Sequence, residues 1–149
     1  MSANVALYSS HLISEEELAE VILEAGGELT PESPSGYFGG LVEGEASVWV
    51  MIIPCYDGVF DWEGRPLNED DMVLLDQAKL LLGGEFQTWI YIALGKGQGS
   101  GRLAVRFAHA SCQHWPCVVD DSEPKSRIFS CEEIEQLYKE GGTFTGYGQ

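Results

Sequence analysis

Apolar and polar residues repeat along the chain with two periods, one typical of helices and the other of strands. Apolar residues recur at every third or fourth position in four stretches, which predict helices over residues 14–27, 68–84, 102–115 and 130–142. The first and last stretches begin with a serine followed three residues later by a glutamate. This pattern predicts capping boxes that pair Ser14 with Glu17 and Ser130 with Glu133.

Each predicted helix has an apolar side that we expect to face the core. These sides are Leu18, Val21, Ile22 and Ala25 in the first helix, Leu74, Leu75, Ala78, Leu81 and Leu82 in the second, Leu103, Phe107 and Ala110 in the third, and Ile134, Leu137 and Tyr138 in the fourth. Glycine pairs follow the first, second and fourth helices and predict where each one stops.

Shorter apolar runs predict strands over residues 5–8, 37–42, 46–53, 85–94 and 117–121. The runs ASVWVMII and EFQTWIYIAL are apolar on both faces, as central strands are. We therefore expect an α+β fold in a single globular domain over residues 1–149. Its architecture should be a sandwich, in which three to four helices pack on a mixed β-sheet of about five to six strands.

Composition narrows the classes of partner. The chain has 149 residues, with 24 acidic and 8 basic side chains and a formal net charge of -16. Such a charge repels nucleic acids and anionic membranes and favours a basic protein partner. The start, MSANVALYSSHL, lacks the basic and apolar regions of a signal peptide, so we expect a cytoplasmic protein. In that compartment the four cysteines should be free thiols: Cys55, Cys112, Cys117 and Cys131.

Aromatic and acidic residues alternate in the segment CYDGVFDWEGRPLNEDD. Aromatic side chains are costly to leave in water and commonly anchor a protein partner, while carboxylates around them suit a basic surface. The alternative is a loop folded back on its own core, with solvated carboxylates. As candidate partner-binding residues we take Tyr56, Asp57, Phe60, Asp61, Trp62, Glu63, Glu69 and Asp70.

The stretch ALGKGQGSGRLAV has the composition of a phosphate-binding loop but fails two known patterns. A P-loop needs a lysine directly after its last glycine, whereas Lys96 comes too early and Arg102 takes that place. The dinucleotide fingerprint needs a glycine at its sixth position. That position is occupied by Ser100 when the count starts at Gly95 and by Arg102 when it starts at Gly97.

The same stretch resembles the acetyl-CoA-binding segment of GNAT acyltransferases, with Gly97 and Gly99 as its two glycines. Leu94 departs from the leading Gln or Arg of that family's pattern. The resemblance implies a pyrophosphate site at a helix start and places Tyr138 at the family's tyrosine. The possible anion site comprises Lys96, Gly97, Gly99, Arg102 and Arg106, and the alternative is a flexible connection with a solvated basic face.

The segment CQHWPC brings Cys112, His114 and Cys117 within six residues. Its spacing is not that of a zinc knuckle, and a fourth ligand would have to come from Cys131. A cysteine–histidine nucleophile is a further alternative. We interpret these residues as core packing and expect neither a metal ion nor a cofactor.

Three segments carry an overall resemblance: LGGEFQTWIYIAL, CQHWPCVVDD and SCEEIEQLY, within roughly residues 69–140. Together they resemble small, acidic immunity proteins of bacterial polymorphic toxin systems, delivered by contact-dependent or type VI routes. The resemblance implies a cytoplasmic, non-enzymatic inhibitor that binds a cognate toxin in a one-to-one complex. The alternative is an acyltransferase that uses acetyl-CoA, with Tyr138 as its general acid.

Overall fold

The computed structural model describes residues 3–30, 37–53, 69–121 and 127–144. The described part contains four helices: α1 (Glu15–Glu24), α2 (Glu69–Leu82), α3 (Ser100–Cys112) and α4 (Cys131–Glu140). It also contains seven strands: β1 (Ala3–Ser9), β2 (Glu28–Leu29), β3 (Gly39–Glu43), β4 (Ala46–Ile53), β5 (Thr88–Leu94), β6 (Cys117–Asp121) and β7 (Arg127–Ser130).

These strands form one sheet in the order β2-β3-β4-β5-β1-β6-β7. Each neighbouring pair among them is antiparallel, and β1 lies between β5 and β6 with Leu7 opposite Ile90 on one side and Val119 on the other. The predicted α+β class is confirmed. The sheet differs in detail from the expectation, because it is antiparallel rather than mixed and gains the short strands β2 and β7, which lack an apolar run of their own.

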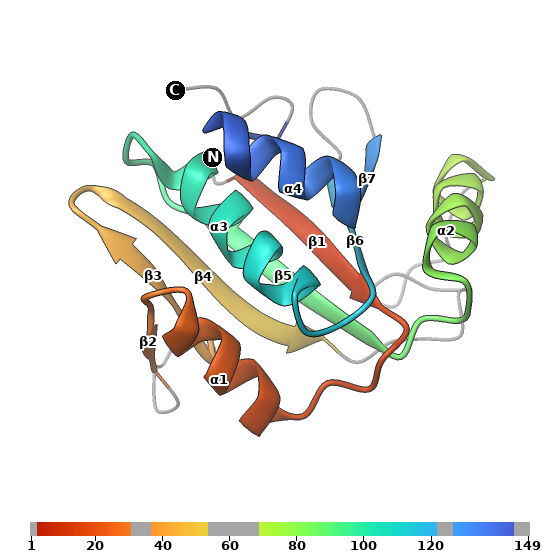
Figure 1. The fold of residues 1–149 in the computed structure, drawn as a ribbon, viewed down its shortest axis with the longest axis horizontal. Coiled ribbons are helices and arrows are strands. Elements are labelled where there is room, and N and C mark those ends of the chain that lie inside the picture. Colours follow the sequence, from red (N-terminus) through yellow and green to blue (C-terminus); the bar gives the residue numbers. More distant parts are fainter. Residues whose placement is uncertain (1–2, 31–36, 54–68, 122–126, 145–149) are drawn as a thin grey trace.

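Three of the helices, α1, α3 and α4, lie on one face of the sheet, whereas α2 lies apart from them at the β6–β7 end (Figure 1). We call the apolar interior under α1, α3 and α4 the main core. It includes Leu7, Leu18, Ile92, Phe107 and Ile134, each fully buried. Alternate strand residues point to the opposite face.

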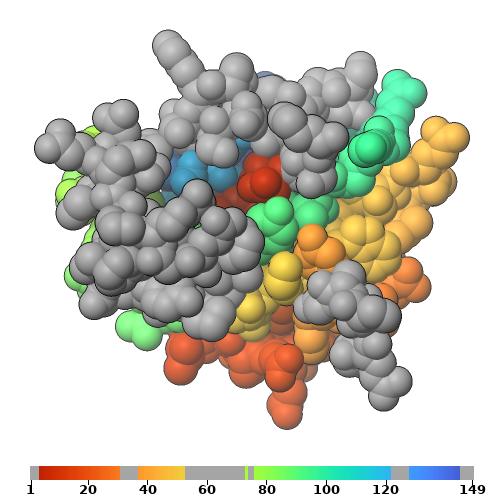
Figure 2. Space-filling model, turned by 180° about the vertical axis from the view of Figure 1, so that it is seen from behind, coloured from red at the N-terminus to blue at the C-terminus, as the bar shows by residue number. Residues whose placement is uncertain are grey.

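On that opposite face lies a small second core, defined by buried Tyr8, Ala78 and Val118. Ala78 comes from α2, and Tyr8 stacks on Phe86 with ring centroids 4.7 Å apart. In the view from behind, atoms of β4 and its neighbouring strands reach the surface (Figure 2). The described helices therefore cover the two faces unequally.

Both predicted capping boxes are confirmed. The Ser14 hydroxyl accepts a hydrogen bond from the Glu17 backbone N–H at 3.1 Å, and the Glu17 carboxylate accepts one from the Ser14 N–H at 3.0 Å. Ser130 and Glu133 repeat this arrangement at the start of α4. Local hydrogen bonds set these helix starts, so the sequence predicts them well.

Two predicted core residues are wrong. Leu81 is 54% exposed and Tyr138 is 47% exposed, although the helical pattern assigned both to buried sides. Leu82 and Leu137 are half-buried beside them, while Leu74 and Leu75 lie outside the described side chains. None of the helices in the described ranges is long and apolar enough to cross a membrane.

Candidate functional site

The candidate partner-binding residues lie mostly outside the described part of the chain. This holds for Tyr56, Asp57, Phe60, Asp61, Trp62 and Glu63. Glu69 and Asp70 form the start of α2, where the structure describes the backbone but not their side chains. The partner surface predicted from this segment therefore stays a prediction.

The glycine-rich loop joins β5 to α3 and lies against the β3–β4 turn. A side chain at Gly97 would meet the Glu45 backbone, and one at Gly95 would meet the Ser47 hydroxyl. Gly99 is the N-cap of α3 with φ +97°, a left-handed conformation that favours glycine. Close packing and backbone geometry thus account for these three glycines without a bound phosphate.

Ser100 fastens the same loop to β4. Its hydroxyl donates a hydrogen bond to the Gly97 carbonyl at 2.8 Å and accepts one from the Ser47 N–H at 3.0 Å. The Gly95 N–H also donates to the Ser47 carbonyl at 2.8 Å. The loop is therefore held by contacts with residues about fifty positions earlier in the chain, and the predicted flexible connection is instead an anchored one.

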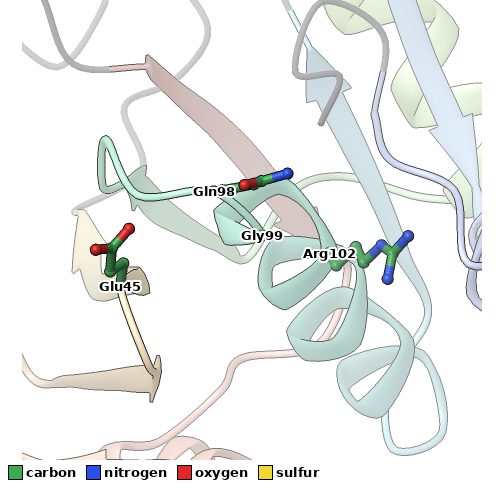
Figure 3. A pocket seen from close by; sticks show the side chains of 4 residues that line it. All are labelled: Glu45, Gln98, Gly99 and Arg102. Atoms are coloured by element: carbon green, nitrogen blue, oxygen red, sulfur yellow. The ribbon is translucent and has the colours of Figure 1, made fainter.

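A hollow of about 320 Å³ lies at the start of α3, lined by Glu45, Gln98, Gly99 and Arg102 (Figure 3). The Arg102 side chain extends away from Glu45 in this view. Because a helix N-terminus attracts anions while the Glu45 carboxylate repels them, the charges around the hollow oppose one another.

The bases of the possible anion site are not gathered at one point. The Arg106 guanidinium donates a hydrogen bond to the Glu43 carboxylate at 3.0 Å, so its charge is already paired. Lys96 and Arg102 are exposed on either side of Gly97 and Gly99. The structure thus brings the glycines together with Arg102 but directs Arg106 to the β3–β4 hairpin.

Tyr138 lies far from the glycine loop. Its ring stacks on His109 with centroids 4.0 Å apart and nearly parallel planes. His109 is in the last turn of α3, about 13 Å along the helix axis from Ser100. The structure does not bring the tyrosine and the glycines into one site.

The structure corrects the prediction that the cysteines are free thiols. Cys112 and Cys131 form a disulfide that joins the end of α3 to the start of α4, so the expectation of free thiols is wrong for this pair. Cys117 is a buried free thiol, and burial raises its pKa to about 12. Because the thiolate is the nucleophilic form, Cys117 is poorly suited to nucleophilic catalysis. Cys55 lies outside the described residues.

The histidines are engaged in separate local contacts. His114 lies 2.7 Å from the Glu24 carboxylate, and His11 lies 2.8 Å from that of Glu17, so the two histidines contact opposite ends of α1. Within the described ranges, no three His, Cys, Asp or Glu side chains come together in a way that could hold a metal ion.

Acidic side chains project from the outer faces of α1 and α4, two of the three helices that cover the main core. The exposed residues are Glu15, Glu16, Glu20 and Glu24 on α1 and Glu132, Glu133, Glu135 and Glu140 on α4. Basic side chains near them are few, and Lys139 is itself paired with Glu135 at 3.3 Å. The outer faces of α1 and α4 are therefore acidic, whereas α3, which lies between them, has no acidic residue and carries Arg102 and Arg106 (Figure 1).

One surface feature was missed from the sequence. Val73, Leu80 and Leu81 are exposed on α2, while Ala78 is fully buried. By helical spacing Val73 and Leu80 lie opposite Ala78, and Leu81 lies at the edge between the two sides. The signal was present in MVLLDQAKLLL, where apolar residues exceed what one buried side can hold. We call these three residues the α2 stripe.

Comparison with known proteins gives no relative. The chain matches no protein-family model, no curated protein and no solved structure.

Proposed function

We propose that this protein is a non-enzymatic immunity protein that binds and neutralises a cognate bacterial toxin through an acidic, aromatic-containing surface. The observation that carries the proposal is the excess of outward-facing carboxylates on a compact core, with 24 acidic against 8 basic residues in the chain. A surface of this kind attracts a basic protein and accelerates its association.

Three of the eight basic side chains are paired with carboxylates of the chain itself. Lys79 lies 3.0 Å from Glu85, Arg106 lies 3.0 Å from Glu43, and Lys139 lies 3.3 Å from Glu135. Such exposed pairs contribute little to stability, and each neutralises one base together with one acid, so the net charge of -16 is unchanged. A toxin with a basic active-site cleft would supply the missing positive charge.

A cytoplasmic location belongs to the same proposal, and the Cys112–Cys131 disulfide bears against it. Disulfides persist in oxidising compartments and are rare where glutathione and thioredoxin keep thiols reduced. Alkylation of the protein in freshly lysed native cells, followed by mass spectrometry, tests the location. Two alkylated thiols at Cys112 and Cys131 support the cytoplasm, and an intact bridge contradicts it.

The function is tested with the protein encoded beside this chain. If that neighbour carries a toxin domain, expression of the domain alone should arrest growth and co-expression with this chain should restore it. The purified pair should form a one-to-one complex whose association rate falls at least tenfold between roughly 50 mM and 500 mM salt. Growth arrest that this chain does not relieve would contradict the proposal.

A double variant tests whether the aromatic and acidic segment CYDGVFDWEGRPLNEDD takes part in binding. Trp62→Ala combined with Asp61→Ala should weaken the complex, because the pair removes an aromatic anchor and a carboxylate. An unchanged dissociation constant would remove this segment from the interface.

The alternative function is an acyltransferase that uses acetyl-CoA. It is favoured by the hollow at the α3 N-terminus, which Gly99 and Arg102 line, because a helix N-terminus and an arginine both attract anions. Binding would raise the free energy of unfolding by about 2.7 kcal/mol when acetyl-CoA is at a hundredfold excess over Kd. No shift of the melting temperature at millimolar acetyl-CoA would exclude this alternative.

A further inference from the structure

Helix α2 is apolar on two opposite sides. Ala78 is fully buried against the second core and Leu82 is half-buried beside it. On the other side, Leu80 is 82% exposed and Val73 is 58% exposed. Val73 and Leu80 are seven residues apart, so they lie on the same side of the helix, nearly two turns from each other.

The α2 stripe differs from other exposed apolar residues of the described chain. The others are single residues of the loop before α1, of α1, β2, β3 and α4, as is normal for a protein surface: Leu12, Leu23, Leu29, Val42 and Tyr138. The stripe instead places Val73, Leu80 and Leu81 within three turns of one helix. Val73 and Leu80 lie on one side of the helix, with the exposed polar residues Asp76 and Gln77 between them. Exposed apolar side chains gathered on one helix typically mark an interaction surface.

The charges around the α2 stripe indicate which kind of partner can bind it. From Glu69 to Glu85 the chain has five acidic residues and one base, Lys79. The Lys79 ammonium lies 3.0 Å from the Glu85 carboxylate and 5.8 Å from the Phe86 ring centre, so its charge is taken up locally. Asp76 is exposed one turn before Leu80, on the same side of the helix.

We propose that the α2 stripe docks into an apolar groove on a basic protein partner, with Asp76 facing a lysine or arginine at the rim of that groove. This inference rests on the proposed function and assigns its binding surface to a specific helix. An amphipathic helix laid in a groove is a common mode of recognition, and here α2 has a second apolar side available for it.

A second copy of this chain is a poorer occupant. Two α2 helices packed together would bring two sets of Asp76 and its acidic neighbours face to face, within chains that each carry a net charge of -16. Like charges juxtaposed across an interface oppose association. Opposite charge favours the basic partner for the same reason.

The test measures the dissociation constant of the complex with the toxin domain encoded beside this chain. The variant is Val73→Ser with Leu80→Ser, which removes the apolar anchors without changing the charge. The matched control is Leu12→Ser with Val42→Ser, which replaces two exposed apolar residues, one in the loop before α1 and one on β3. Because the replaced side chains are exposed, both variants should keep the wild-type melting temperature.

We expect at least a tenfold increase in Kd for the α2 variant and less than about a twofold change for the control. Asp76→Asn should slow association at low salt and have little effect at high salt. Equal affinities of wild type and α2 variant would overturn the assignment to α2 and leave the proposed function standing. A wild-type chain that binds no toxin would overturn both.

Analytical ultracentrifugation of the free protein tests whether a second copy of this chain binds the α2 stripe instead. A monomer over the working concentration range supports the proposal. A dimer that the Val73→Ser, Leu80→Ser variant abolishes would show that a second copy covers the stripe, and would overturn it.

Discussion

The two faces of the sheet differ in how completely helices cover them. On one face, α1, α3 and α4 enclose the main core, which reaches from Leu18 on α1 to Ile134 on α4 (Figure 1). On the other face, α2 buries Ala78 against Tyr8 and Val118 but leaves Leu80 and Leu81 in solvent. The first face thus holds most of the buried apolar side chains, while the second leaves apolar side chains of α2 exposed.

The largest expected effect separates the two cores by their contribution to stability. Phe107→Ala leaves a large cavity in the main core and should lower the free energy of unfolding by about 3–5 kcal/mol. Leu82→Ala removes a half-buried side chain from the second core and should cost about 1 kcal/mol. Urea denaturation of both variants measures the difference, and equal losses would contradict the division between the cores.

The next largest effect on stability is expected from removal of the disulfide, which lies on the face of the main core. The Cys112–Cys131 bridge closes a loop of nineteen positions between α3 and α4, so Cys112→Ser with Cys131→Ser should cost about 3 kcal/mol. Wild-type protein unfolded in the presence of a reductant is the matched control and should lose the same amount. A midpoint unaffected by the reductant would show that the bridge does not support this core.

A smaller effect is expected at the start of α1. The Ser14 hydroxyl accepts the Glu17 N–H at 3.1 Å, and Ser14→Ala should cost about 1 kcal/mol in urea denaturation. Ser10→Ala, in the loop before the helix, is a control that should have no measurable effect. Equal losses in the two variants would exclude the cap as the cause.

The smallest effect is a dependence on pH at the same cap. Hydrogen bonds from the Ser14 N–H and from His11 lower the Glu17 pKa from 4.5 to about 2. A lowered pKa in the folded state means that Glu17 stabilises the protein above about pH 4.5 and loses this contribution as the pH falls towards 2. Glu17→Gln should therefore be less stable than wild type at pH 7 but nearly equal to it near pH 2. A constant difference across this range would contradict the assignment.

The sequence predicts best what neighbouring residues determine. The capping boxes at Ser14 and Ser130 and the buried side of α1 follow from spacings within one or two helical turns. Leu81 was misplaced because α2 is apolar around most of its circumference, so periodicity alone cannot select its buried side. The helix pattern therefore selected the buried side of α1 correctly but failed at Leu81 on α2 and at Tyr138 on α4.

Contacts between distant residues account for the rest. The glycines before α3 suggest a phosphate loop, yet Gly95 and Gly97 pack on Ser47 and Glu45, which only the folded sheet brings near. The disulfide likewise depends on the approach of α3 to α4 across nineteen positions. Neither contact has a local signature in the chain.

Amide hydrogen exchange of the free protein and of its complex with the toxin domain tests the division between the two faces most directly. In the free protein, amides of α3 should exchange more slowly than those of α2, because α3 packs into the main core. On binding, the largest gain in protection should fall on α2, around Val73 to Leu81. Protection gained on α1 and α4 with none on α2 would contradict the account.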